Sequence, residues 1–194
     1  LKDPRDLDAA FRLVFNGGWT HSSTGATPNG TNGYADTFYN PSASGQLNSA
    51  HVSYYSRTNS NGTEVEIGVE RPITNFQLLE IRTAGLTYFY MNQGGGLGIA
   101  DANSLGYYIG NRTASNVVNG FKNGTKINNA STSSILLPNA KIYLAAYNQS
   151  NNTAAAFSTK QSAFATIGDG LTDTDASNLY TRVQAYQTAL SRQV

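Results

Sequence analysis

Short runs of apolar and aromatic residues alternate with polar residues along most of the chain. Such runs recur about every ten residues between turn-forming residues, which is typical of the strands of a two-sheet sandwich. The predicted strands are 51–57, 64–69, 76–82, 86–91, 106–110, 117–118, 141–147 and 153–157. Because side chains alternate between the two faces of a strand, Tyr88 and Tyr90 should share one face of 86–91. Phe89 and Met91 should share the opposite face.

Asn-Gly pairs mark the turns between these runs. They stand at 16–17, 29–30, 32–33, 61–62, 119–120 and 123–124. An Asn-Gly pair favours the type I′ turn of a two-residue hairpin, because both central residues need a positive φ. The pair Asn123–Gly124 predicts the clearest hairpin. The glycine-rich run 94–98 lacks the Lys and Ser/Thr of a phosphate-binding loop, so we expect it to be a loop or hairpin tip.

The pattern changes to helical spacing near the end of the chain. Thr172 is the predicted N-cap of one helix over 172–191, and Asp175 completes an acidic capping box. The apolar stripe that should pack on the sandwich consists of Leu179, Val183, Tyr186 and Leu190, with Tyr180 and Gln187 partly off it. No internal repeat or low-complexity linker divides the chain, so residues 1–194 are expected to form one domain, with 1–8 as a leading segment.

Composition excludes several classes of partner. Only 13% of the residues are charged and the formal net charge is +1, so we expect no binding to nucleic acid or to a membrane surface. The absence of Cys removes disulfides, thiolate metal sites and Cys nucleophiles. The chain instead holds 21 Asn, 18 Ser, 20 Thr and 12 Tyr. Aromatic faces that stack on sugar rings, and amides that bond to hydroxyls, are the groups that bind neutral sugars.

The candidate carbohydrate-binding residues are aromatic or amide side chains in or beside the predicted strands, with one His and one Arg. They are Trp19, His21, Tyr54, Arg57, Tyr88, Tyr90 and Asn92. The alternative interpretation is that tyrosines at the rim of a sandwich, or in a contact between subunits, pack in the same way without a ligand.

The sequence contains little that indicates a catalytic carboxylate pair or a calcium site. Glu64 and Glu66 share one face of a predicted strand, but the Asp of a laminarinase-type Glu-x-Asp-x-x-Glu motif is absent. We interpret this pair as a solvated strand face. The loop carboxylates that calcium would use, Asp36, Asp101 and Asp169, are far apart in the sequence. We therefore predict no catalytic residue, no metal ligand and no cofactor.

Two sets of segments resemble known families. Segments 28–36, 121–126 and 167–180 resemble parts of laminin-G-like, concanavalin-A-like jelly rolls. Segments 2–6, 17–23, 53–58 and 187–194 are similar to domains of virion structural proteins of tailed bacteriophages. The resemblance implies an all-β jelly-roll sandwich of two antiparallel sheets with one C-terminal α-helix. Because the chain starts with Leu1 rather than Met, we expect it to be the C-terminal part of a longer parent chain.

The resemblance also implies a function. It implies a non-enzymatic tail-fibre or head-fibre domain on the virion surface, in contact with other virion proteins and with host-surface polysaccharide during host attachment. Virion fibres are built from symmetric copies, so a homo-oligomer is expected and a trimer is favoured. Two alternatives remain open. One is a polysaccharide-degrading glycosidase on the same fold, and the other is a purely architectural decoration domain without a ligand.

Overall fold

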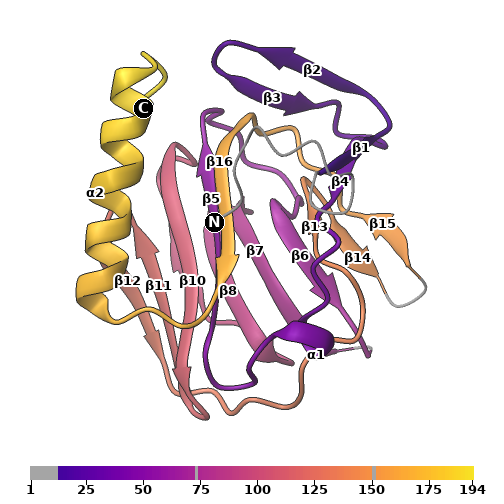
Figure 1. Cartoon of the computed structure of the whole chain (residues 1–194), viewed down its shortest axis with the longest axis vertical. Coiled ribbons are helices and arrows are strands. Elements are labelled where there is room, and N and C mark those ends of the chain that lie inside the picture. Colours follow the sequence, from indigo (N-terminus) through magenta and orange to yellow (C-terminus); the bar gives the residue numbers. More distant parts are fainter. Residues whose placement is uncertain (1–12, 73, 150–151) are drawn as a thin grey trace.

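Two β-sheets pack face to face in the computed structural model, which describes residues 13–72, 74–149 and 152–194 (Figure 1). Within these residues the only helices are the single turn α1 (Pro41–Ser44) and the long helix α2 (Asp173–Ala189). The predicted sandwich with one C-terminal helix is therefore confirmed. The predicted leading segment 1–8 lies outside the described residues.

The first sheet has nine strands within the described ranges and the second has seven. In spatial order, the first sheet contains β1 (Val14–Asn16), β4 (Tyr34–Asp36), β13 (Tyr143–Leu144), β6 (Ile67–Glu70), β7 (Phe76–Thr83), β8 (Leu86–Gln93) and β9 (Gly98–Ala100), while β14 (Tyr147–Gln149) pairs with β6 and β15 (Thr153–Ala155) pairs with β14. The second sheet contains β12 (Thr125–Ala130), β11 (Val117–Lys122), β10 (Gly106–Ala114), β5 (Ala50–Ser56), β16 (Ser162–Gly168), β3 (Gly25–Pro28) and β2 (Trp19–Ser22). The described strand pairs are antiparallel except β14 with β6.

The core between the sheets follows the predicted alternation in β8. Phe89 and Met91 are fully buried and face the second sheet, whereas Tyr88 and Tyr90 are half-buried on the outer face of the first sheet. The predicted strand 141–147 is instead divided into β13 and β14, because Ala145 between them adopts a φ of 63°. A left-handed residue interrupts an extended strand, so the apolar run alone does not fix the strand's length.

The predicted hairpin at Asn123–Gly124 is confirmed. Both residues have positive φ, 50° and 75°, at the turn between β11 and β12. The prediction of a turn at 119–120 is wrong, because Gly120 lies inside β11. A Cβ on Gly120 would come within 2.3 Å of the Phe89 ring. This glycine therefore makes room for an aromatic side chain of the opposite sheet rather than for a turn.

Helix α2 covers part of the outer face of the second sheet, over β10 and β11 (Figure 1). The predicted capping box is present, because the Thr172 hydroxyl accepts a hydrogen bond from Asp175 N and the Asp175 carboxylate accepts one from Thr172 N. The helix packs Ala176 and Val183 against a second apolar cluster that includes Phe121.

The predicted stripe of α2 is only partly correct. Val183 is buried, but Tyr186 and Leu190 are 50% and 44% exposed. The buried face instead runs through Ala176, Val183 and Gln187. Leu179 and Tyr180 are partly buried and also pack against the apolar cluster beneath the helix.

Arg112 in β10 is a fully buried charged residue that the sequence pattern did not single out. Burial lowers the pKa of its guanidinium to about 10, so the group stays charged at neutral pH. It donates hydrogen bonds to the main-chain carbonyls of Met91, Ala114, Ser115 and Thr132 and to Oε1 of Gln93. One side chain thus joins segments from both sheets at the end of the core.

Candidate functional site

The outer face of the first sheet carries a cluster of aromatic rings. The Tyr88 and Tyr90 rings lie parallel within 22°, with centroids 6.0 Å apart, and the Phe76 ring lies 5.3 Å from that of Tyr90. All three side chains are half-buried, so part of each ring faces solvent. Two of the predicted sugar-binding residues are therefore brought together, and Phe76 extends the surface that they form.

The glycine-rich connection between β8 and β9 explains why these rings pack closely against the main chain. A Cβ on Gly96 would lie 2.7 Å from the Tyr90 ring, and one on Gly98 would lie 2.7 Å from the Tyr88 ring. Residues 94–97 form the predicted hairpin tip and Gly98 begins β9, and the missing side chains of Gly96 and Gly98 leave space for the two rings. This second role was not predicted from the sequence.

A cavity of about 380 Å³ lies beside the rings on the same face. Its lining residues are Thr63, Glu64, Val65, Phe76, Leu78, Glu80, Thr83, Tyr147 and Ala156. Leu78 and Glu80 alternate along β7 with Leu79 and Ile81, which belong to the core, and so they face outward. The volume suits one sugar residue of a glycan, with aromatic and carboxylate groups in the wall.

Glu80 is the carboxylate of this cavity that accepts no hydrogen bond from a described residue. It is half-buried and lies directly across the strand pair from Tyr88, yet no described residue donates a hydrogen bond to its carboxylate. Burial raises the pKa of Glu80. Burial and the nearby Glu80 charge together raise the pKa of Tyr90 to about 12, and the pKa of Tyr147 is raised by burial and by the charges of Glu70 and Glu80.

Glu64 and Glu66 are not a solvated strand face, so that interpretation is wrong. Lys160 is completely buried and forms ion pairs with both carboxylates, at 3.1 Å and 3.0 Å. Glu66 is also fully buried and accepts a hydrogen bond from Ile81 N. Burial raises the pKa of Glu66 to about 7. Although burial opposes it, hydrogen bonding from Thr159 and the charge of Lys160 hold the pKa of Glu64 below its ordinary value.

Tyr54 and Asn92 cannot be sugar-binding residues, because both are completely buried. The Tyr54 hydroxyl donates to the main-chain oxygen of Lys160 within the sandwich. The Asn92 amide donates to the main-chain oxygen of Leu47. Their predicted roles are therefore wrong. Arg57 is half-buried, and its guanidinium is already bonded to Gln161 Oε1 and to a main-chain oxygen near the C-terminus.

Trp19 and His21 lie together elsewhere, on β2 at the edge of the second sheet. Their rings are 6.2 Å apart, and the Phe15 ring of β1 packs edge-on against both, at 4.9 Å and 4.8 Å. The Trp19 indole donates a hydrogen bond to Asn16 O, which fixes the ring. His21 and Phe15 are exposed and Trp19 is half-buried, and none of the described cavities is lined by Trp19 or His21.

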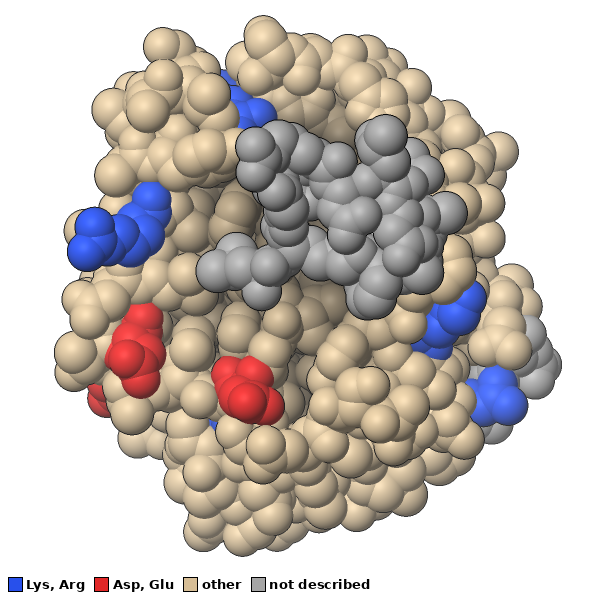
Figure 2. Space-filling view, viewed as in Figure 1, with Lys and Arg blue, Asp and Glu red and all other residues tan. Residues whose placement is uncertain are grey.

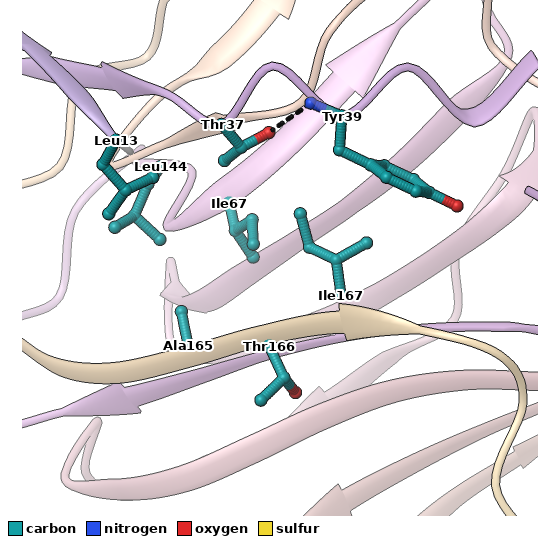
Figure 3. A pocket seen from close by; sticks show the side chains of 8 residues that line it. All are labelled: Leu13, Thr37, Tyr39, Ile67, Leu144, Ala165, Thr166 and Ile167. Carbon is teal, nitrogen blue, oxygen red and sulfur yellow. Dashed lines mark hydrogen bonds between the residues drawn. The ribbon is translucent and has the colours of Figure 1, made fainter. Parts of the chain in front are cut away.

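A different cavity of about 340 Å³ opens between the two sheets (Figure 3). Its lining residues are Leu13, Thr37, Tyr39, Ile67, Leu144, Ala165, Thr166 and Ile167. The Thr37 hydroxyl donates to Ile142 O and accepts from Tyr39 N, and the Thr166 hydroxyl is bonded to His51 and Ser53. Because these hydroxyls are already engaged and the remaining wall is mainly aliphatic, this cavity offers little to orient a sugar.

Metal binding at loop carboxylates gains no support from the geometry. Within the described part of the chain, no three His, Cys, Asp or Glu side chains come close enough to hold a metal ion. Asp101 is held by hydrogen bonds from Thr87, Tyr108 and Lys122, and Asp36 pairs with Lys141. None of the described helices is both long and apolar enough to cross a lipid bilayer.

Comparison with known proteins identifies the fold but no family. No family model matches the chain, and no curated protein matches its sequence. A solved structure of HCR/D-Sa-GBL1/C is similar, with a TM-score of 0.57, 12% identity, and coverage of 89% of this chain and 47% of that chain. A single-substitution mutant of HCR/D gives a TM-score of 0.53, 12% identity, and coverage of 89% and 46%.

A mutant of Trypanosoma rangeli sialidase displaying trans-sialidase activity is also similar, with a TM-score of 0.52, 12% identity, and coverage of 92% of this chain and 30% of that chain. The chain thus spans less than half the length of these solved structures. Similarity at this identity concerns the fold alone. The chain is an all-β jelly-roll sandwich of two antiparallel sheets with one C-terminal helix.

Proposed function

We propose that this protein is a non-enzymatic carbohydrate-binding domain of a virion fibre, and that it binds a glycan on the outer face of its first sheet. The observation that carries the glycan proposal is the stacked, half-exposed pair Tyr88–Tyr90 beside a cavity of about 380 Å³. Aromatic rings stack on the apolar faces of sugars, and nearby polar groups bind the hydroxyls.

A fixed platform favours binding because little side-chain freedom is lost when the glycan arrives. The Tyr88 and Tyr90 rings are held against the main chain of Gly96 and Gly98 and against each other. Phe76 adds a third ring at the rim of the cavity. These contacts support recognition of a sugar by a preformed surface.

The absence of catalysis is part of the proposal and rests on the state of Glu64. Most retaining and inverting glycosidases use two carboxylates that are free to act on the scissile bond. The cavity contains Glu64 and Glu80. Both oxygens of Glu64, however, already accept hydrogen bonds from Thr159, and one of them also pairs with Lys160. This bonding favours a structural role for Glu64.

The glycosidase alternative keeps one supporting observation. The pKa of Glu64 is lowered and that of Glu80 is raised, and such a divergence is the pattern of a base and an acid in one site. Release of reducing ends from polysaccharides, abolished by Glu80→Gln, would establish the enzyme. We expect no release by the unmodified protein.

The glycan proposal is tested with a glycan array and the double variant Tyr88→Ala/Tyr90→Ala. We expect the unmodified protein to bind a defined group of glycans and the double variant to lose at least ten-fold in affinity. Tyr186→Ala is the matched control, because Tyr186 is 50% exposed on α2, away from the first sheet. Equal binding by the double variant would refute this site, and binding to no glycan would favour a purely architectural domain.

The virion role rests on the sequence resemblance and is supported by the character of the surface. Charged side chains are few and scattered on the face shown in Figure 2, so little repulsion opposes the packing of copies or of other virion proteins. Exposed apolar residues, Leu13, Val14 and Phe15, gather along the edge strand β1. We propose a homo-oligomer, most simply a trimer, on the particle surface.

Two measurements test this role. Antibody labelling of purified particles should locate the protein on the virion surface. Light scattering should give a multiple of the 20.7 kDa chain mass. Absence from the particle, together with a strictly monomeric mass, would contradict the virion proposal without affecting the glycan proposal.

A further inference from the structure

Three tyrosines lie near Glu80 on the outer face of the first sheet. Tyr88 faces it across the β7–β8 pair, and its charge acts on the hydroxyls of Tyr90 and Tyr147. We call Glu80 with Tyr88, Tyr90 and Tyr147 the acidic aromatic box. No described residue donates a hydrogen bond to the Glu80 carboxylate, although burial removes part of its hydration. A desolvated carboxylate without a donor is unfavourable, and a bound cation would relieve that.

The charged side chains in the described lining of the cavity are both acidic. The described lining of the cavity contains Glu64 and Glu80 and neither Lys nor Arg. The buried Lys160 is already paired with Glu64 and Glu66 and is completely inaccessible. The charge of Glu70 also acts on Tyr147. The site therefore disfavours uronic acids, sialic acids and other anionic sugars, since like charges in a partly desolvated cavity repel.

An ammonium group satisfies the box in two ways. It would form an ion pair with a carboxylate to which no described residue donates, and nearby aromatic rings attract cations. A neutral hydroxyl would provide only a hydrogen bond. The size of the cavity, about 380 Å³, admits a sugar that carries such a group.

We infer that the glycan bound at Tyr88 and Tyr90 contains amino sugars whose amino groups are free rather than acetylated, with one ammonium placed against Glu80. This inference rests on the proposed glycan site and specifies its ligand class. It also predicts that N-acetylation of the same sugar removes the ion pair and adds a bulky neutral group in its place.

The experiment compares two tetrasaccharides that differ only in acetylation, β-1,4-linked glucosamine and β-1,4-linked N-acetylglucosamine, by isothermal titration calorimetry at mildly acidic pH. We expect the unmodified protein to bind the glucosamine tetramer at least ten-fold more tightly. Glu80→Gln, which keeps the shape of the side chain, should remove this preference. Asp173→Asn makes the same change of net charge on the exposed end of α2, 62% exposed, and should leave the preference intact.

Each outcome decides between the claims. Equal binding of the two tetramers, or tighter binding of the acetylated one, would overturn the amino-sugar inference. A preference that persists in Glu80→Gln would overturn the assignment to Glu80. Binding of neither tetramer, by a protein that still binds other glycans through Tyr88 and Tyr90, would overturn the inference while the proposed function stands. Binding to no glycan of any class would overturn both. Circular dichroism and melting temperature confirm that each variant is folded.

Discussion

Replacement of Arg112 by Met should destabilise the sandwich strongly. The side chain is fully buried, and its guanidinium donates to four main-chain carbonyls and to one side-chain oxygen. Met keeps most of the aliphatic volume but donates no hydrogen bond. The substitution therefore leaves acceptors in the core without donors, and this loss, rather than lost packing, dominates the effect.

The loss of unfolding free energy depends on how deeply each hydrogen-bond acceptor of Arg112 is buried. Two bonds are fully buried, to Met91 O at 2.6 Å and to Gln93 Oε1 at 2.8 Å. An acceptor left unpaired in a protein interior costs about 1–3 kcal/mol, so these two together cost about 2–6 kcal/mol. The remaining carbonyls are partly buried, and water can replace the guanidinium there. For a chain of this size the loss corresponds to a fall in Tm of roughly 5–20 °C.

The assay is urea unfolding monitored by circular dichroism, with Arg182→Met as the control. Arg182 is exposed on α2, so the same substitution there should change the free energy of unfolding by less than about 0.5 kcal/mol. Arg112→Lys should lie between the two, because an ammonium donates fewer hydrogen bonds in this geometry. If Arg112→Met and Arg182→Met have equal stability, the buried hydrogen-bond network is not as described.

Two further predictions concern the turn and the buried carboxylates. Gly124→Val should lower the free energy of unfolding by about 2 kcal/mol or more, because a β-branched residue would take a φ of 75° and its Cβ would lie 2.8 Å from the Tyr180 ring. Thermal unfolding measures this loss. The control Gly95→Val should show no such loss, because its Cβ would meet nothing within 4 Å. For Glu66, burial raises the folded-state pKa to about 7, so the folded protein holds a proton that the unfolded chain loses at lower pH. Its contribution to stability is therefore complete below the ordinary Glu pKa and declines as pH rises towards 7. The stability difference between the unmodified protein and Glu66→Gln should change across this pH range, and a constant difference would contradict the raised pKa.

Local patterns were sufficient for much of the fold. The alternation in 86–91 correctly separated Tyr88 and Tyr90 from Phe89 and Met91, because a strand has only two faces. Thr172 and its partner three residues later formed the predicted capping box, since both groups belong to one helical turn. Features of this kind depend on neighbours in the sequence, and so the sequence alone predicts them.

Features that depend on distant partners could not be predicted in this way. Tyr54 and Tyr55 are adjacent and equally apolar, so the pattern does not say which of them faces the core between the sheets. Asn92 looked like an accessible amide, but it is enclosed and bonded to Leu47, 45 residues away. Burial is a property of the packed sandwich, and composition gives no measure of it for a single side chain.

The carboxylates show the same limit. The Lys160 that neutralises Glu64 and Glu66 lies 96 and 94 residues further along the chain, so the pair resembled an exposed strand face. The sequence does not predict Glu80 as a site residue, because a single Glu in a predicted strand is common. Its importance appears only when β7 and β8 bring it beside the ring of Tyr88. Contacts that form only in the folded sandwich therefore explain both why the interpretation of Glu64 and Glu66 was wrong and why Glu80 was not predicted as part of the site.

The most direct test of the central claim is a crystal structure of the protein with its tightest-binding glycan. The account predicts a sugar ring stacked on Tyr88 and Tyr90, with an adjoining residue in the cavity beside Glu80. A glycan bound instead at the Trp19–His21 cluster, or in the cavity between the sheets, would contradict the claim that the outer face of the first sheet is the carbohydrate site.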